Sequence, residues 1–366
     1  MVLALAASCD IGPIRRVGPK PTPPSGPEPT VDAGPIFEER RAVLPVQPGM
    51  TVHMVEFADR DNGYALAVSC GPEHTPTGGP AQQDNQRCVG ELAATTDGGR
   101  TWTARQHPAP VASNHQIYAL DGSTVALFTE DTGYYLSLDG ARTFAKVTEP
   151  IPSVRYGLFC EPSPCGVFQF TPIGPATRVP AQPDLPGEIG SVVEGADGGI
   201  WAASLAADGK PYTASSSNLG QSWQRHEVLA PDGVRLQRVE LQVSADGSDV
   251  WLLGFHGGEP NLFPSAIWYY EPGGWARRAV GGHPPEGFVT PAGGQVLAAA
   301  GPAGMGVLDS GVANGEYQKR PDWPNARDHV DELLDGTLVA RSGDRLWLGL
   351  GNGTQRRWIS IITTTS

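Results

Sequence analysis

TTDGGRTWTA, residues 95–104, is the stretch that decides the fold. The short apolar run ELAATT leads into Asp97-Gly98-Gly99, and a second run begins at Thr101, so the segment predicts a β-hairpin whose turn needs residues that tolerate positive φ. The Asp97 carboxylate can accept backbone N–H groups within such a turn, and Trp102 supplies a large apolar side chain. Similar strings recur as SLDGARTF (137–144) and SSNLGQSW (216–223), with weaker echoes as EPGGW (271–275), NGEY (314–317) and GNGTQRRW (351–358).

The spacing of these turns predicts the architecture. Equivalent turn positions are Asp97, Asp139, Asn218, Pro272, Asn314 and Asn352. Most steps between them are about 40–55 residues, as in propeller blades of four short strands, and the one long step indicates a repeat that has lost its signature. Apolar runs suited to innermost strands start near His53, His115, Tyr156, Ser191, Val239, Phe288 and His329. We therefore expect an all-β propeller over residues 42–363, with seven blades (six are possible), each a four-stranded antiparallel sheet.

The aromatic residue that follows each turn is expected to pack between neighbouring blades. These residues are Trp102, Phe144, Trp223, Trp275, Tyr317 and Trp358. Burying each of them contributes roughly 1.5–3 kcal/mol. We interpret them as core residues and not as a ligand cage.

Composition excludes some partners. The net charge of −13 and the pI near 5.0 would repel a phosphate backbone, so nucleic acid is not an expected ligand. The sequence contains no Gly-rich phosphate loop, H-E-x-x-H, metal-spaced Cys/His cluster or G-x-S-x-G elbow. We therefore expect no cofactor and no metal, and we expect a monomer.

The cysteines indicate an oxidising compartment. Cys70 with Cys88, and Cys160 with Cys165, form two local pairs without the C-x-x-C spacing of zinc or redox sites. Two disulfides are the natural interpretation. Four unrelated buried thiols are the alternative.

The amino end predicts a membrane tether. Residues 1–9, MVLALAASC, resemble the end of a bacterial lipoprotein signal in which Cys9 becomes the lipidated first residue. The run is short and lacks a positively charged start, so we expect the true start codon to lie upstream. Residues 10–41 are Pro-rich and suit a semi-rigid spacer. The alternative is an ordinary cleaved signal followed by a disordered tail.

Two family resemblances rest on these motifs. TDGGRTW, SLDGARTF and SNLGQSW resemble the Asp-box (BNR) repeat of sialidase-like propellers, and DRDNGY (59–64) is similar to blades of the photosystem II assembly and stability factor family. The resemblance implies that each box joins the third and fourth strands, away from the ligand mouth. The residues that it makes structural are Asp97, Gly99, Trp102, Asp139, Phe144, Asn218 and Trp223.

Binding residues are predicted from position in the ring. In a propeller the chain enters each innermost strand from the mouth, which would place Arg155, Arg238 and Arg327 there, where guanidinium groups could hold an anion. Other residues expected at comparable places are His53, His115, Asp328 and His329. The alternative is that these are ordinary solvated charges and capping histidines.

Two polar insertions, 71–87 and 254–265, are expected in second-to-third-strand loops at the same mouth. His256 and Phe263 would be aromatic contacts of the second loop. Decoration without a ligand is an equal alternative for both insertions.

These observations favour an extracytoplasmic, membrane-tethered propeller that binds or scaffolds a protein or glycan. An exo-acting glycosidase of the sialidase superfamily is the main alternative. The R-I-P motif expected for it is missing, with PIRRV (13–17) and FEERR (37–41) the nearest strings, so no catalytic residue is assigned and an enzyme is the less favoured interpretation. An assembly factor for a membrane complex is a third possibility.

Overall fold

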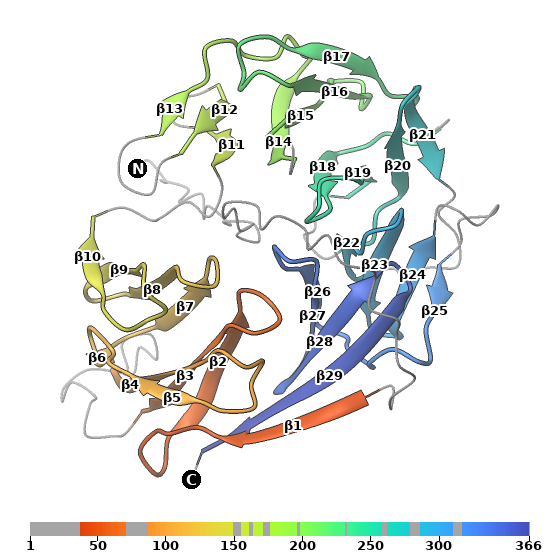
Figure 1. Ribbon diagram of the computed structural model, residues 1–366. Coiled ribbons are helices and arrows are strands. Elements are labelled where there is room, and N and C mark those ends of the chain that lie inside the picture. Colours follow the sequence, from red (N-terminus) through yellow and green to blue (C-terminus); the bar gives the residue numbers. More distant parts are fainter. Residues whose placement is uncertain are drawn as a thin grey trace, which may run out of the picture.

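Seven β-sheets form a ring around a central axis (Figure 1). The computed structural model describes residues 37–70, 87–148, 155–160, 164–170, 176–195, 198–230, 233–257, 262–278, 286–309 and 317–365. The chain in these ranges is all-β, and no helix there is long and apolar enough to cross a bilayer. The seven-bladed prediction is confirmed.

Consecutive strands build each blade from the axis outward. Blade 1 contains β2 (Thr51–Phe57), β3 (Gly63–Ser69), β4 (Cys88–Thr95), β5 (Thr103–Arg105) and the short β6 (Val111–Ala112) beside β4. Blade 2 contains β7 (His115–Ala119), β8 (Val125–Thr129), β9 (Gly133–Ser137) and β10 (Ala145–Val147). Blade 3 contains β11 (Tyr156–Phe159), β12 (Gly166–Gln169) and β13 (Thr177–Arg178). Blade 4 contains β14 (Glu188–Glu194), β15 (Ile200–Leu205), β16 (Pro211–Ser216) and β17 (Gln224–Glu227).

The remaining blades follow the same plan. Blade 5 contains β18 (Arg238–Val243), β19 (Val250–Phe255), β20 (Ala266–Glu271) and β21 (Gly274–Arg278). Blade 6 contains β22 (Phe288–Pro291), β23 (Val296–Gly301), β24 (Gly304–Asp309) and β25 (Gln318–Lys319). Blade 7 contains β26 (His329–Glu332), β27 (Leu338–Ser342), β28 (Arg345–Asn352) and β29 (Gln355–Thr364). All seven predicted innermost-strand starts fall in or at the edge of β2, β7, β11, β14, β18, β22 and β26.

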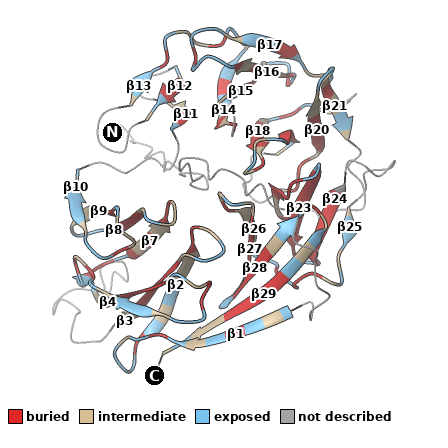
Figure 2. Cartoon of the chain, in the orientation of Figure 1, coloured by how far each residue is buried: buried red, intermediate tan, exposed pale blue. Residues whose placement is uncertain are grey.

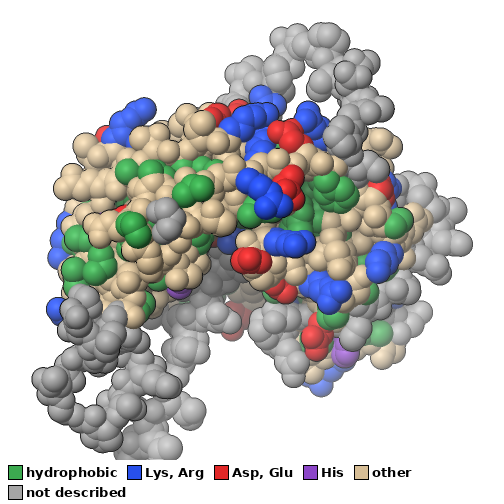
Figure 3. All heavy atoms as spheres, turned by 90° about the horizontal axis from the view of Figure 1, so that it is seen from below, with side chains coloured by type: hydrophobic (Ala, Val, Ile, Leu, Met, Phe, Trp, Pro, Cys, Tyr) green, Lys and Arg blue, Asp and Glu red, His purple; other side chains and the backbone are tan. Residues whose placement is uncertain are grey.

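The two ends of the chain meet in blade 7. The strand β1 (Phe37–Val43) pairs in parallel with β29, from Phe37 opposite Trp358 to Val43 opposite Thr364. The folded domain thus begins earlier than residue 42, because the last part of the predicted tether is a strand of this blade. Glu38 and Glu39 are followed by Arg40 and Arg41 in this strand, and Glu38 contacts both Arg40 and Arg357. Figure 3 shows acidic and basic side chains close together on the face seen from below. Charged edge strands of this kind discourage pairing with other chains.

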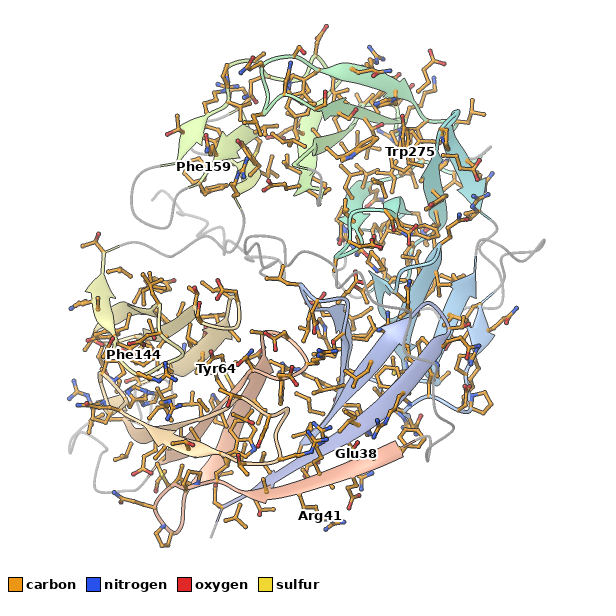
Figure 4. The ribbon with its side chains drawn as sticks, viewed as in Figure 1. Glu38, Arg41, Tyr64, Phe144, Phe159 and Trp275 are labelled. Atoms are coloured by element: carbon orange, nitrogen blue, oxygen red, sulfur yellow. A yellow bond between two sulfur atoms is a disulfide. The ribbon has the colours of Figure 1, made fainter. Side chains whose placement is uncertain are left out.

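Apolar residues are buried where neighbouring blades meet. Figure 2 shows the buried residues along the strands of the ring. Trp358 is fully buried between blades 6 and 7, and Trp275 lies between blades 4 and 5 (Figure 4). The other predicted aromatics, Trp102, Phe144, Trp223 and Tyr317, also contact clusters that join two blades. Within the described residues such a cluster spans every junction except that between blades 2 and 3, where the long repeat step was noted.

Three turns between the third and fourth strands share one hydrogen-bond pattern. In the first, Asp97 Oδ1 accepts the N–H groups of Arg100 (3.0 Å) and Thr101 (2.9 Å), and Asp97 Oδ2 accepts the Thr101 hydroxyl (2.6 Å). The Thr95 hydroxyl donates to Asp97 Oδ1 and accepts the Gly99 N–H. The backbone is left-handed at Gly98 and Gly99, with φ of 70° and 85°, as the prediction requires.

The other two turns repeat this geometry with different side chains. Asp139 Oδ1 accepts the N–H groups of Arg142 and Thr143, and Asn218 Oδ1 accepts that of Ser222. Because strands within each blade are antiparallel, these turns lie on the face opposite the starts of the innermost strands. We call the side with these turns the turn face, and the side where the innermost strands start the mouth face.

Candidate ligand site on the innermost strands

Three arginine–glutamate pairs lie on or beside the innermost strands, and we call them the inner-strand pairs. They are Arg155–Glu194, Arg238–Glu240 and Arg341–Glu56, with N···O distances of 3.6, 3.3 and 2.8 Å. Two of the three arginines are those predicted from the sequence. The third is Arg341 in place of Arg327, which is exposed.

The Arg238 pair lies at the mouth-face end of blade 5. Arg238 begins β18, and its guanidinium lies over the Phe255 ring, 3.8 Å from the centroid. Its Nη1 contacts Glu240, two residues further along the same face of the strand, and both side chains are about one-third exposed. Gln242, next on this face, donates to Glu240 at 2.9 Å and to the Val289 carbonyl of blade 6 at 3.0 Å.

The Arg341 pair joins the last blade to the first. Arg341 on β27 contacts Glu56 on β2, and it lies opposite His329 in the ladder. The His329 ring packs edge-on against Phe288 of blade 6, at 4.9 Å. Burial lowers the pKa of His329 and Arg341 adds to this, while Asp331 and Glu56 raise it in part.

The Arg155 pair joins blades 3 and 4. Arg155 directly precedes β11 and reaches Glu194, the last residue of β14. Burial raises the pKa of Glu194, and Arg155 lowers it in part. The guanidinium also lies over the Tyr156 ring, at 5.1 Å.

Several buried polar atoms in this region have no hydrogen-bond partner among the residues that the structure describes. They are Glu194 Oε2, Arg238 Nε and Nη2, Gln242 Oε1 and Arg341 Nε. Buried polar groups nearly always have a partner, so each such atom marks a place where a ligand or water can complete the bonding. The Nε and Nη2 edge of Arg238 presents two parallel donors.

Two of the three predicted arginines already have an acidic partner. Arg155 and Arg238 each contact a glutamate of their own and Arg327 is exposed, so a shared anion site of the three guanidinium groups stays a prediction. Net charge near each pair is therefore close to balanced. The arrangement suits a polar ligand with both donors and acceptors.

Other predicted mouth residues have structural surroundings. His115 is 2% exposed, with both ring nitrogens engaged, and Phe263 is 2% exposed in the core between blades 5 and 6. His53 is exposed at a bulge in β2, Asp328 accepts the Gly343 N–H at 2.6 Å, and His256 contacts Ser265. Phe263 is thus buried in the core and is not the exposed aromatic contact that the loop pattern predicted.

Both disulfides are present, Cys70–Cys88 and Cys160–Cys165. The insertions lie between second and third strands as expected, but 71–86 and 258–261 fall outside the described residues, as do Cys9 and the tether up to residue 36. No group of three or more His, Cys, Asp or Glu arranged to hold a metal occurs in the described ranges.

Sequence reasoning missed the glutamates and Arg341. Glu240 could have been found, because it lies two residues after Arg238 in a strand and therefore shares its face. Glu56 and Arg341 are far apart in the sequence, and only ring closure brings them together.

Comparison with known proteins gives little beyond the fold. No family model matches the chain, and no curated protein does. Similar solved structures include YCF48 bound to D1 peptide (TM-score 0.40, 15% identity, 88% of this chain and 96% of that one). YCF48 from Cyanidioschyzon merolae has a TM-score of 0.42 at 13% identity, covering 83% and 94% of the two chains. An ancestral GH74 enzyme has a TM-score of 0.44 at 14% identity, covering 86% and 47%. At these values the similarities carry no argument about function.

Proposed function

We propose that this protein is a binding module whose innermost strands recognise a polar segment of a protein or glycan. The observation that carries the proposal is the set of buried, unpaired polar atoms at the inner-strand pairs. Leaving such atoms without partners costs about 1–3 kcal/mol each, and a ligand that supplies the missing bonds recovers that free energy. The set includes donors on Arg238 and Arg341 and acceptors on Glu194 and Gln242, which fits hydroxyl or amide groups.

Binding is favoured over hydrolysis by how the carboxylates are engaged. Most glycosidases use two carboxyl groups that flank one bond, one protonated and one ionised, whereas sialidases use a tyrosine nucleophile. Here Glu56, Glu194 and Glu240 each contact a different arginine at a different position around the ring. Such pairs suit a static, hydrogen-bonding surface.

The proposed setting is outside the cytoplasmic membrane. Two disulfides favour an oxidising compartment. We further propose that Cys9 carries a lipid and that the Pro-rich segment after it spaces the ring from the bilayer. The three matching turns are proposed to be Asp-box repeats, which would make them structural elements of the turn face.

The binding proposal is tested with purified wild-type protein and two variants. A glycan array and chemical cross-linking to the native cell envelope each provide a readout for one ligand class. Arg238→Ala should weaken binding by at least about tenfold, as expected for loss of a charged hydrogen bond worth about 1.5–3 kcal/mol. Arg225→Ala is the matched control, because Arg225 is exposed and stacks on Tyr212 at the outer edge of blade 4.

Equal binding by wild type and Arg238→Ala would contradict the proposal. Turnover of a fluorogenic glycoside that Glu194→Gln abolishes would replace it with a hydrolase. The tether is tested separately by labelling cells with radioactive palmitate, which should label the wild type and not Cys9→Ala.

A further inference from the structure

Two buried histidines link blades 1 and 2 on the mouth face. His107 follows β5, His115 begins β7, and the His107 Nε2 and His115 Nδ1 atoms are 3.2 Å apart. The other nitrogen of each ring is also engaged. The Ala109 N–H donates to His107 Nδ1 at 3.1 Å, and His115 Nε2 lies 3.1 Å from the Cys88 carbonyl oxygen.

These contacts assign both tautomers. A backbone N–H can only donate, so His107 Nδ1 is an acceptor and the proton of this ring is on Nε2. His107 Nε2–H then donates to His115 Nδ1, which leaves the proton of the second ring on Nε2 to donate to the Cys88 carbonyl. Hydrogen bonds therefore run in one direction, from Ala109 through both rings to Cys88. A proton added to either ring would place two N–H groups face to face.

The surroundings hold both rings in place. The charged groups described nearby are not placed to stabilise a proton added to either ring. His107 and His115 are 7% and 2% exposed, and they cross directly over Gly90 of β4, where a Cβ would lie 2.9 Å from His115. Charged residues on the neighbouring elements are used elsewhere. Glu91 of β4 accepts the Gln47 N–H, and Asp131 of the β8–β9 hairpin holds the Ser113 N–H at 2.8 Å and Arg87 at 3.7 Å.

We propose that the His107–His115 pair is an acid-sensitive latch that fastens blade 1 to blade 2 at neutral pH and releases this junction on acidification. Cys88 is the residue through which the latch would act on the mouth face, because it begins β4 and carries the disulfide to Cys70 that closes the 71–87 insertion. The latch goes beyond the proposed binding function and does not depend on it.

The expected pH window follows from His107. Burial, and then the neighbouring His115, lower the pKa of His107 to about 3, against 6.5 for the free side chain. Between these two pH values, His107 is protonated when the junction is open and neutral when it is closed. The opening equilibrium should therefore rise up to about tenfold for each unit that the pH falls below 6.5, and the closed state is favoured most above that value.

Hydrogen–deuterium exchange measured by mass spectrometry at several pH values, corrected for intrinsic exchange rates, tests the latch. Opening at residues 87–95 and 107–119 should increase at least tenfold between pH 7 and pH 5. Segment 250–255 in blade 5 is the internal control and should change less. No preferential opening at the first two segments would overturn the proposal.

Two further measurements separate the latch from general acid sensitivity. His107→Asn can keep an acceptor for Ala109 and cannot titrate, so the pH dependence at the junction should become clearly smaller than in the wild type. His226→Asn is the matched control, because His226 is also buried and bonded, to Ser215 in blade 4, and should leave the junction's pH dependence intact. Persistence of the full pH dependence in His107→Asn contradicts the latch.

If His107→Asn does not fold, nitrogen-detected NMR of the wild type decides. A neutral His107 with its proton on Nε2 down to pH 5 supports the proposal. A His107 that becomes charged between pH 6 and 7 in the folded protein overturns it.

Discussion

The turn at 95–101 and the innermost strand β18 use polar side chains in opposite ways. Both Asp97 carboxylate oxygens accept hydrogen bonds from residues within four positions in the sequence. On β18, Arg238 reaches Glu240 with one nitrogen and leaves two buried nitrogens without a partner. The polar groups of the turn find their hydrogen-bond partners among neighbouring residues in the sequence. On the inner strand, two Arg238 nitrogens can still donate a hydrogen bond to a ligand. A polar group that is fully satisfied supports the fold, and one that is not is available to a ligand.

Among side chains whose polar groups are fully hydrogen-bonded, we expect Arg356 in blade 7 to have the largest effect on stability. This residue lies just after the β28–β29 turn and donates to the carbonyls of Gly336, Gly349, Gly353 and Ala292, the last in blade 6. Arg356→Ala should lower the free energy of unfolding by about 3 kcal/mol, because it removes four hydrogen bonds that the guanidinium makes to backbone carbonyls. Chemical denaturation measures the change. Arg357→Ala is the control at the next residue: its side chain is half exposed and pairs with Glu38, so the loss should stay below about 1 kcal/mol.

Asp97 tests the repeated turn itself. Asp97→Ala removes all hydrogen bonds of this side chain and should lower the free energy of unfolding by about 2 kcal/mol. This value is at the upper end of the cost of removing a helix N-cap. Asp97→Asn should cost less than about 1 kcal/mol, because Asn218 makes the equivalent bonds in blade 4. Equal losses in the two variants would show that the carboxylate charge, and not the hydrogen-bond pattern, holds the turn.

The same turn makes stability depend on acid in a defined window. Burial raises the pKa of Asp97, but hydrogen bonds from Thr101, Thr95 and Arg100 outweigh this effect. The pKa is lowered to about 2, against 3.8 for the free side chain. The unfolded chain therefore takes up a proton first, so this contribution is complete above pH 3.8 and is lost as the pH falls toward 2. Unfolding free energies measured from pH 5 to pH 2 should fall less steeply in Asp97→Asn than in the wild type.

The inner-strand side of the comparison predicts the smallest stability change. Arg238→Ala should alter the unfolding free energy by about 1 kcal/mol or less, because the side chain is one-third exposed and its ion pair is screened by solvent. If Arg238→Ala loses ligand binding but keeps its stability, Arg238 serves binding whereas Arg356 serves the fold. A loss of stability as large as that of Arg356→Ala would place Arg238 in the structural framework.

How far the sequence predicts this structure depends on how local each feature is. The turn at Asp97 and its copies at Asp139 and Asn218 are encoded within a few consecutive residues, so their position between third and fourth strands was predictable. The innermost strands were predictable as well, since each is a short apolar run after a turn. The blade count follows from these two features together.

The candidate site was predictable only in part because its contacts are non-local. Arg155 and Arg238 were found from their positions at the starts of innermost strands, but Arg341 and Glu56 meet only when blade 7 closes on blade 1. Phe263 was misjudged because a loop residue can fold back into a core, as this one does against Tyr317. His115 was expected at the mouth, and its partner His107 carried no repeat signal that would have revealed the pair.

Hydrogen exchange on the protein purified from its native envelope, with and without its cross-linked ligand, tests the central claim directly. Ligand should protect the innermost strands, above all residues 238–243 and 51–57, and leave the turns at 95–101, 137–143 and 216–222 unchanged. Protection confined to those turns would contradict the account, because it would place recognition on the face whose polar groups are already satisfied.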